Sequence, residues 1–315
     1  MQRTITPKHI RLIISALLGE SGLMLNSATS GLGAMLLLPA IALAGVDVCD
    51  QPDEYSRLSL GYFQQDDSGF DENPGRLGRE DRFADLQYKA NDRWSVGIRH
   101  RYVILDVEPA ELQTNGHLHT LSFPAHRRSG SDEKGFRFSI APTLSASSNI
   151  MKDPGEFTAD TFQLLAAALW NRQLSSGADL RYGLCADHRF GEYAIYPSIT
   201  LAWRPHPHWL IELGFPMTRM SYQVSSGVTT SLRIAPDGNE WHVKSRDLER
   251  QSQLVHEALQ LRWAFDWQAS EHIGLSVAIA RLFRSRYNVT LVDDTRAELD
   301  LDTATRVGAA VEWRF

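Results

Sequence analysis

The sequence has few cysteines, no long apolar run beyond its first 45 residues and no excess of positive charge. Its two cysteines, Cys49 and Cys185, allow at most one internal disulfide bridge, and the sequence leaves open whether they form it. After residue 45 the longest apolar run, residues 164–170, has seven residues, whereas a membrane-spanning helix needs about 20. The formal net charge of −6 gives no reason to expect a nucleic-acid partner. We therefore exclude a helical membrane protein and a nucleic-acid binder.

Motifs for cofactors and metals are also missing. The sequence contains no G-x-G-x-x-G or G-K-[ST] loop and no C-x-x-C pair. His206 and His208 in the stretch PHPH resemble a metal-ligand pair, but neither cysteine nor further ligands accompany them. We predict that the protein holds no cofactor and no metal, and we interpret both histidines as solvated side chains at the level of lipid headgroups.

The N-terminus is typical of an exported protein. A basic start between Arg3 and Arg11 is followed by an apolar stretch at residues 33–44 and then by the acidic sequence GVDVCDQPDEY. Ala42 and Ala44 fit the A-x-A pattern at which a signal peptidase cuts. We predict that residues 1–44 are a secretory signal peptide and that residues 45–315 form one domain.

The rest of the chain repeats one pattern, a two-residue alternation of apolar and polar side chains. In WSVGIRHRYVI, Trp94 and Ile98 share one face, while Arg99 and Arg101 lie on the other. The chain ends on the same alternation in RVGAAVEWRF, residues 306–315. The segments are roughly 9–13 residues long, which suits a tilted membrane-spanning strand of about 9–11 residues better than a soluble strand of about five or six. The pattern predicts strands that cross a membrane.

The connections between these segments are of two kinds. We predict short turns at AND (90–92), PHPH (205–208), PDGN (236–239) and ASEH (269–272), and long polar loops at 64–81, 105–116, 147–156, 245–251 and 292–302. Asp237 and Gly238 supply the hairpin signal of the third turn. Short turns on one side and long loops on the other are the layout of an outer-membrane barrel.

The predicted fold class is all-β, a transmembrane antiparallel up-and-down β-barrel of about 14 strands, with about 12 as the alternative. The strands are predicted at 55–63, 82–90, 94–104, 117–125, 134–146, 157–171, 178–190, 194–204, 208–217, 227–235, 240–246, 252–267, 273–290 and 303–315. This arrangement places every short turn and both termini on one side, which we expect to be the periplasmic side of a bacterial outer membrane.

Aromatic residues support this interpretation. Trp and Tyr prefer the membrane–water interface, because the ring is half buried there while its N–H or O–H meets the headgroups. We predict interface aromatics beside the short turns and at the C-terminus: Trp94, Trp203, Trp209, Trp267, Trp313 and Phe315. In a soluble β-sandwich, the alternative fold, tryptophans are expected in the middle of strands.

Charged side chains fall on the face opposite the apolar row, which in a barrel is the lumen. The predicted lumen-lining residues are Arg99, Arg101, Arg137, Arg181, Arg262, Arg284, Arg306, Asp187, Glu212, Asp266 and Glu312. Two accounts stay open: a network of ion pairs that fills a closed barrel, or a water-filled pore whose positive potential favours anionic solutes. His100, Glu257 and Arg281 fall on the apolar face and are exceptions to the pattern.

The segment YPSITLAWRPHPHWLIELGFP, residues 196–216, resembles a pattern in a family of bacterial outer-membrane β-barrel proteins of unknown function. The resemblance covers residues 120–315 and implies the barrel fold but no activity. The chain end, with Trp313 and Phe315, also resembles the outer-membrane assembly signal. This resemblance implies recognition of the C-terminal strand by the assembly machinery. As further partners of an outer-membrane barrel we expect outer-membrane lipid and lipopolysaccharide. The oligomeric state is left open.

Two stretches contain the residue types of a hydrolase. HLHTLSF offers His117, His119 and Ser122, but the serine does not follow the H-x-S spacing of barrel phospholipases. ADHRFGEY offers Asp187 and His188 without an adjacent serine. Because a Ser-His-acid site is built by geometry, a missing motif does not exclude one. We predict a non-enzymatic outer-membrane barrel, either a passive pore or a structural barrel, with a lipid hydrolase and a secreted soluble β-sandwich binding protein as the alternatives.

Overall fold

The structure, a computed structural model, describes residues 48–50, 55–70, 73–108, 116–131, 134–174, 177–244, 251–290 and 296–315. The predicted signal peptide at residues 1–44 lies outside the described residues, and its cleavage after Ala44 stays a prediction. No helix among the described residues is long and apolar enough to cross a membrane.

Almost all of the described chain is strand. The strands are β1 (Arg57–Phe70), β2 (Asn73–Lys89), β3 (Trp94–Glu108), β4 (Gly116–Ser122), β5 (Ala125–Gly130), β6 (Lys134–Ser147), β7 (Phe162–Gln173), β8 (Asp179–Asp187), β9 (Ala194–Trp203), β10 (Trp209–Phe215), β11 (Thr218–Ser225), β12 (Val228–Pro236), β13 (Asn239–Lys244), β14 (Gln251–Gln268), β15 (Ile273–Thr290), β16 (Arg296–Leu301) and β17 (Ala304–Arg314). The helical segments are α2 (Ser148–Met151) and two 3-10 turns, η2 (Pro154–Glu156) and η3 (Ala159–Thr161).

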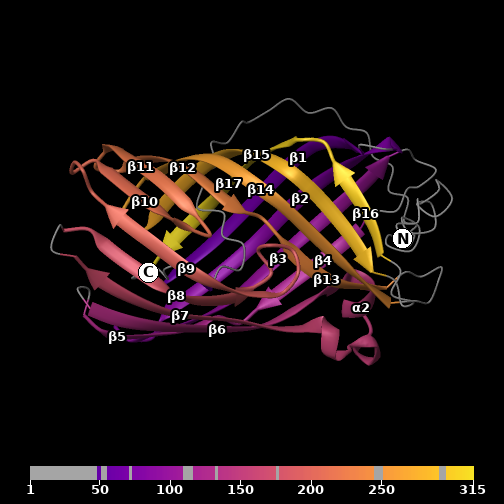
Figure 1. The fold of residues 1–315 in the computed structure, drawn as a ribbon, viewed down its shortest axis with the longest axis horizontal. Coiled ribbons are helices and arrows are strands. Elements are labelled where there is room, and N and C mark those ends of the chain that lie inside the picture. Colours follow the sequence, from indigo (N-terminus) through magenta and orange to yellow (C-terminus); the bar gives the residue numbers. More distant parts are fainter. Residues whose placement is uncertain are drawn as a thin grey trace.

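These segments close into a ring of 14 strands (Figure 1). Strands that follow one another along the chain pair antiparallel, and β17 pairs with β1 to close the ring, with Arg306 opposite Gln65. Three strands of the ring each consist of two segments, namely β4 with β5, β12 with β13, and β16 with β17, because both segments of each pair lie along the same neighbour. The structure confirms the predicted transmembrane β-barrel and its strand number.

The two ends of the barrel differ. One end, here called the turn end, carries the short connections at 90–93, 204–208 and 269–272 and the C-terminal residues. The opposite end, here called the loop end, carries α2, η2 and η3. In Figure 1 the strands run obliquely along the long axis, with β5, β10 and β11 toward the turn end and α2 toward the loop end.

The prediction of a hairpin at PDGN is wrong, because β12 and β13 run through it as one strand. Asp237 forms an ion pair with Arg306 at 2.8 Å. Gly238 lies so close to Gly191 that a Cβ on it would come within 2.3 Å of the Gly191 backbone nitrogen. Both residues therefore make tertiary contacts at the junction between the two segments of one strand. The strand that was not predicted is β11, which lies between the predicted strands 208–217 and 227–235. As a result β12 runs from the turn end to the loop end, opposite to the predicted direction.

The predicted loop at 64–81 is also wrong. β1 continues to Phe70 and β2 begins at Asn73, so most of this polar stretch is strand. Gln65, Arg79 and Asp81 are buried and alternate into the lumen, which accepts polar side chains. The predicted loop at 292–302 is likewise partly strand, as β16, whereas the predicted loop at 147–156 is confirmed by α2 and η2.

The outer face of the barrel is apolar and the inner face is mostly polar. Large apolar side chains such as Ile98, Leu213 and Val277 are about half exposed along the outer rows. On the inner face two phenylalanine rings of the turn half lie over glycines: a Cβ on Gly308 would come within 1.9 Å of the Phe63 ring. Gly308, in the C-terminal strand, therefore makes room for a ring inside the lumen.

At the loop end the ring is narrower and its interior is apolar. There β13 pairs with β14 on one side and makes a parallel contact with β6 on the other. β6 and β13 are therefore direct neighbours at this end, although β7 to β12 separate them elsewhere in the ring. The interior is filled by the buried side chains of Leu77, Val103, Leu105, Val107, Leu118, Trp241, Val243, Leu254, Tyr287, Val289 and Leu301, here called the apolar core. Trp241 has no exposed surface, and its ring nitrogen donates a 3.1 Å hydrogen bond to Thr120. The straight path through the loop end is therefore occupied.

Candidate functional site

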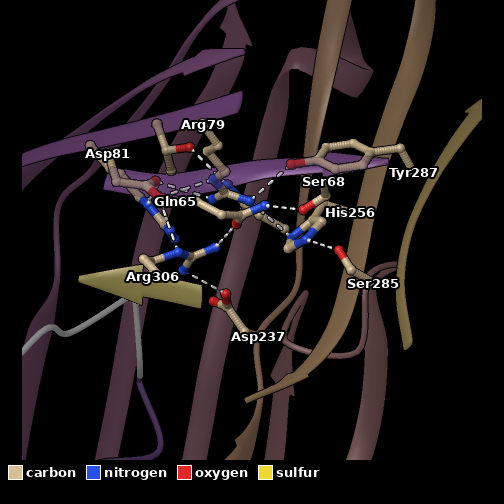
Figure 2. A network of polar contacts seen from close by, with 12 residues as sticks. Gln65, Ser68, Arg79, Asp81, Asp237, His256, Ser285, Tyr287 and Arg306 are labelled. Carbon is tan, nitrogen blue, oxygen red and sulfur yellow. Dashed lines mark hydrogen bonds and ion pairs between the residues drawn. The ribbon is translucent and has the colours of Figure 1, made fainter. Parts of the chain in front are cut away.

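The middle of the lumen holds a buried ion-pair network (Figure 2). Asp81 accepts hydrogen bonds of 2.9 Å from Arg79 and from Arg101, and Arg306 approaches it to 3.8 Å. Arg306 also pairs with Asp237 at 2.8 Å. The side chains of Arg79, Asp81 and Arg306 are at most 5% exposed. Because three guanidinium groups share two carboxylates, each member of the network compensates the charge of another.

Arg79 connects this network to a histidine. It lies 3.1 Å from Nδ1 of His256 and 3.1 Å from the hydroxyl of Tyr287, and Nε2 of His256 lies 3.3 Å from Oγ of Ser285. A guanidinium group only donates, so Nδ1 must accept and the ring proton must sit on Nε2. His256 therefore donates to Ser285 and cannot take a proton from it.

Two further groups of ion pairs line the turn half of the lumen. Asp85 pairs with Arg99 at 2.8 Å and with Arg57 at 3.4 Å, and Arg57 also reaches Glu312 at 3.2 Å. On the other side of the barrel the buried carboxylate of Glu212 pairs with both Arg181 and Arg219. The charged side chains of the lumen thus form ion pairs with one another along the wall.

Residues 48–50, here called the N-terminal segment, lie inside the lumen. Cys49 forms a disulfide with Cys185 on the inner face of β8, and Val48 is only 1% exposed. Arg137 donates a 3.2 Å hydrogen bond to the carbonyl oxygen of Cys49, and Arg233 lies 3.6 Å from the carboxylate of Asp50. One covalent bond and two arginines therefore hold the segment against the barrel wall.

The barrel wall is short at β10 and β11. β10 and β11 are only seven and eight residues long, and they turn back at residues 216–217, far short of the loop end. The gap is filled by residues 188–193, here called the latch loop, whose Phe190 packs on Tyr196 and Phe215 with ring centres 5.0 and 5.7 Å away. Phe190 and Tyr196 also belong to the cluster that buries the N-terminal segment. The N-terminal segment and the latch loop thus meet close to the end of the short strand β10.

Residues 85–313, well over half of the chain, match the family described as a domain of unknown function (DUF6268). The chain belongs to this family. No curated protein matches it. Its fold is similar to an outer membrane channel from Pseudomonas putida F1 (10% identity, 87% of this chain and 100% of that chain, TM-score 0.45). It is also similar to the translocator domain of the autotransporter NalP from Neisseria meningitidis (9%, 84% and 90%, 0.40) and to a mutant of TodX, a monoaromatic hydrocarbon channel of Pseudomonas putida (10%, 84% and 90%, 0.42).

The structure places most predicted lumen residues on the inner face. These residues are Arg99, Arg101, Arg137, Arg181, Arg262, Arg306, Asp187, Glu212, Asp266 and Glu312. Arg284 is the exception, since it is exposed and has a φ of 51°. It lies where β15 carries one residue more than β14, between the pairs Glu257 with Arg286 and Leu259 with Phe283. This bulge displaces the alternation, which is why the prediction for Arg284 differs from the structure.

The predicted interface aromatics all lie at the turn end: Trp94, Trp203, Trp209, Trp267, Trp313 and Phe315.

The charged residues that are exceptions to the apolar pattern of the outer face have polar partners on that face. Arg281 donates to Thr305 at 2.6 Å, Glu257 lies 3.6 Å from Arg286, and His100 contacts a second histidine. These partners lower the cost of placing polar groups on the lipid side.

Several members of the lumen network were not found by sequence reasoning. They are Arg57, Arg79, Asp81, Asp85, Arg219, Arg233, Asp237 and His256. One signal for them exists in the stretch R-x-D-x-F-x-D at residues 79–85, which alternates with period two. The expectation of a long loop at 64–81 hid this signal.

The hydrolase candidates of the sequence do not assemble. Ser122 has no exposed surface and accepts a 3.0 Å hydrogen bond from Thr143 on the inner face, whereas His117 and His119 lie on the outer face of the same strand. A spacing of three residues puts a serine and a histidine on opposite faces of a strand. Asp187 accepts instead from Tyr196 at 2.8 Å. Across the described ranges, no group of three or more His, Cys, Asp or Glu residues could hold a metal ion.

Proposed function

We propose that the protein is a passive channel of the bacterial outer membrane that its own N-terminal segment holds closed. The observation that carries this proposal is the placement of residues 48–50 inside the lumen, where Cys49 is bonded to Cys185. The exposed apolar outer face and the aromatic residues at the turn end support an outer-membrane location. The terminal aromatics Trp313 and Phe315 support recognition of β17 by the assembly machinery, with lipid and lipopolysaccharide around the wall.

The solutes that fit such a channel are small anions. Most lumen arginines are ion-paired within the wall and contribute little fixed positive potential. Arg137 and Arg233 contact the N-terminal segment, at the carbonyl of Cys49 and the carboxylate of Asp50. When the segment leaves, an entering anion can take over these two contacts.

In this proposal, solutes bypass the apolar core where the short strands β10 and β11 leave the barrel wall short. The apolar core occupies the straight path at the loop end, whereas the N-terminal segment meets the latch loop, whose Phe190 packs on Phe215 at the end of β10. We therefore place the exit at the latch loop. The lumen itself supplies no catalyst in this proposal, since its histidine–serine pair at His256 and Ser285 is buried and carries the proton on the wrong nitrogen.

Planar-bilayer conductance of refolded, oxidised protein tests the proposal. The wild type is expected to be silent, and the double variant Cys49→Ser/Asp50→Asn, which removes the covalent bond and the ion pair, is expected to show discrete anion-selective steps. Asp92→Asn is the matched control, because it removes a carboxylate from an exposed turn at the turn end. Adding Arg233→Gln to the double variant should reduce the anion preference. A silent double variant that still folds, shown by a heat-modifiable gel shift, would contradict a channel closed by this segment.

A further inference from the structure

A second cluster of polar side chains lies on the outside of the barrel, near the loop end. His100 on β3 and His119 on β4 both face outward, and Ser148 at the start of α2 lies beside them. Nε2 of His119 is 2.7 Å from Oγ of Ser148, and Nδ1 of His119 is 3.1 Å from Nε2 of His100. The chain therefore presents a serine, a histidine and a third group in series, which is the arrangement of an activated nucleophile.

The geometry of the two histidines suits a hydrogen bond between ring nitrogens. Their ring centres are 5.4 Å apart and their planes differ by 10°. Together with the 3.1 Å contact, these values place the rings edge to edge in nearly one plane. The ring of Tyr102 packs on His119 at 4.7 Å and fixes its orientation, and the Tyr102 hydroxyl in turn contacts His117. His119 is thus oriented by two neighbours.

The hydrogen-bond pattern allows His119 to act as a base. With the His119 proton on Nδ1, that nitrogen donates to Nε2 of His100 and leaves Nε2 of His119 to accept the Ser148 hydroxyl proton. His256 in the lumen has the opposite pattern, because Arg79 donates to its Nδ1. The two pairs also differ in access: Ser285 and His256 are each 1% exposed, whereas Ser148, His119 and His100 are partly exposed.

The surroundings of Ser148 are apolar on one side and polar on the other. Toward the turn end the outer face carries the exposed side chains of Ile98, Phe162 and Leu164. Toward the loop end lies a polar cavity of about 280 Å³ lined in part by Glu80, Arg82 and His117. Lys152, the residue after α2, adds a positive charge close to His117 and His119. These two surfaces would suit a lipid, with its acyl chain along the apolar side and its headgroup in the cavity.

We propose that Ser148, His119 and His100 form a catalytic site on the lipid-facing surface that hydrolyses carboxylic acyl esters of outer-leaflet lipids. Oγ of Ser148 attacks the ester carbonyl carbon while its proton passes to Nε2 of His119. His119 returns that proton to the leaving alcohol oxygen, which releases a lysolipid and leaves an acyl ester on Ser148. Water then attacks the acyl carbonyl through His119, and the fatty acid leaves as the proton returns to Ser148. His100 is a positioning residue, since its hydrogen bond is to His119 and not to a reacting atom.

The experiment uses full-length refolded protein, a serine-reactive fluorophosphonate probe, and two substrates: micelles of diacyl phosphatidylcholine and purified lipopolysaccharide. We expect the probe on Ser148 by peptide mass spectrometry and release of fatty acid from one substrate or both, which also identifies the lipid source. Ser148→Ala and His119→Ala should each lower kcat by at least about 10³-fold. Ser285→Ala, which alters the buried histidine–serine pair, should leave both readouts unchanged.

His100 separates a positioning role from a merely structural one. His100→Leu should lower kcat and the labelling rate at Ser148 together, whereas His100→Gln, whose amide oxygen can accept from Nδ1 of His119, should restore a large part of both. A heat-modifiable gel shift shows that each variant folds. Folded wild-type protein that neither labels at Ser148 nor releases fatty acid would overturn the proposal, as would activity that survives Ser148→Ala.

Discussion

Removal of one buried carboxylate should destabilise the barrel far more than removal of its sequence neighbour. Asp81 faces the lumen and accepts hydrogen bonds from Arg79 and Arg101, with Arg306 at 3.8 Å. Glu80, the preceding residue, faces outward and pairs with Arg82 at 3.0 Å. Asp81→Asn and Glu80→Gln each remove one negative charge without changing side-chain size, so the pair isolates the effect of burial.

The expected magnitudes differ because the two sites differ in exposure. Asp81→Asn leaves the guanidinium groups of Arg79, Arg101 and Arg306 short of a carboxylate, and breaking a buried pair in this way costs about 3–5 kcal/mol. The side chains of Arg82 and Glu80 are 55% and 34% exposed, and an exposed pair contributes less than about 1 kcal/mol. Asp81→Asn should therefore lower the free energy of unfolding several times more than Glu80→Gln.

Equilibrium unfolding in guanidinium chloride, followed by tryptophan fluorescence of protein refolded into lipid vesicles, measures both values under the same conditions. Each variant must show reversible unfolding with the slope of the wild type, so that only the midpoint differs. Equal midpoints for the two variants would refute the reasoning, because they would show that the lumen network is not a buried, mutually compensating set of charges.

Three further predictions concern the connections and the bulge. Gly238→Val should push the latch loop away, since a Cβ at this position meets the backbone of Gly191 at 2.3 Å, and trypsin should then cut faster after Arg189. Hydrogen bonds from Lys244 and Gln251 lower the pKa of Glu156 below its ordinary 4.5. The stability that these contacts add is fully present above pH 4.5 and is lost as the pH falls through the lowered pKa. Amide hydrogen exchange in residues 148–161 should therefore become faster only in more acidic solution. Arg284→Gly should raise the free energy of unfolding by up to about 1 kcal/mol, measured by the same denaturant titration, because Arg284 has a φ of 51°.

The barrel could be predicted from the sequence because its physics is local and periodic. Alternation over long segments and tryptophans beside turns fix the lipid side, and RVGAAVEWRF shows both features within ten residues. The errors arise where local signals and tertiary contacts disagree. Asp237 and Gly238 carry a strong hairpin signal, yet one is an ion-pair partner of Arg306 and the other makes room for the latch loop. Strand β11 was missed although Met220, Tyr222 and Val224 alternate, so the strand number is confirmed through two errors that cancel.

The candidate sites were less predictable, because they join residues that are distant in sequence. The bridge between Cys49 and Cys185 spans 136 residues, and the sequence offered only the two cysteines. Ser122 stands close to His119 in the sequence, whereas the serine that contacts His119 is Ser148, beyond the next strand. Alternation predicts which face a residue occupies, but not which connection folds back over that face.

Peptide mapping of oxidised protein isolated from outer membranes tests the central claim most directly. Cys185 lies on β8 and faces the lumen of the barrel, so Cys49 can reach it only if the N-terminal segment enters the barrel. A non-reducing digest followed by mass spectrometry should contain one disulfide-linked pair of peptides that joins Cys49 to Cys185, and a thiol-reactive maleimide should label neither residue before reduction. Recovery of both cysteines as maleimide adducts from folded, unreduced protein would contradict a lumen closed by its own N-terminal segment.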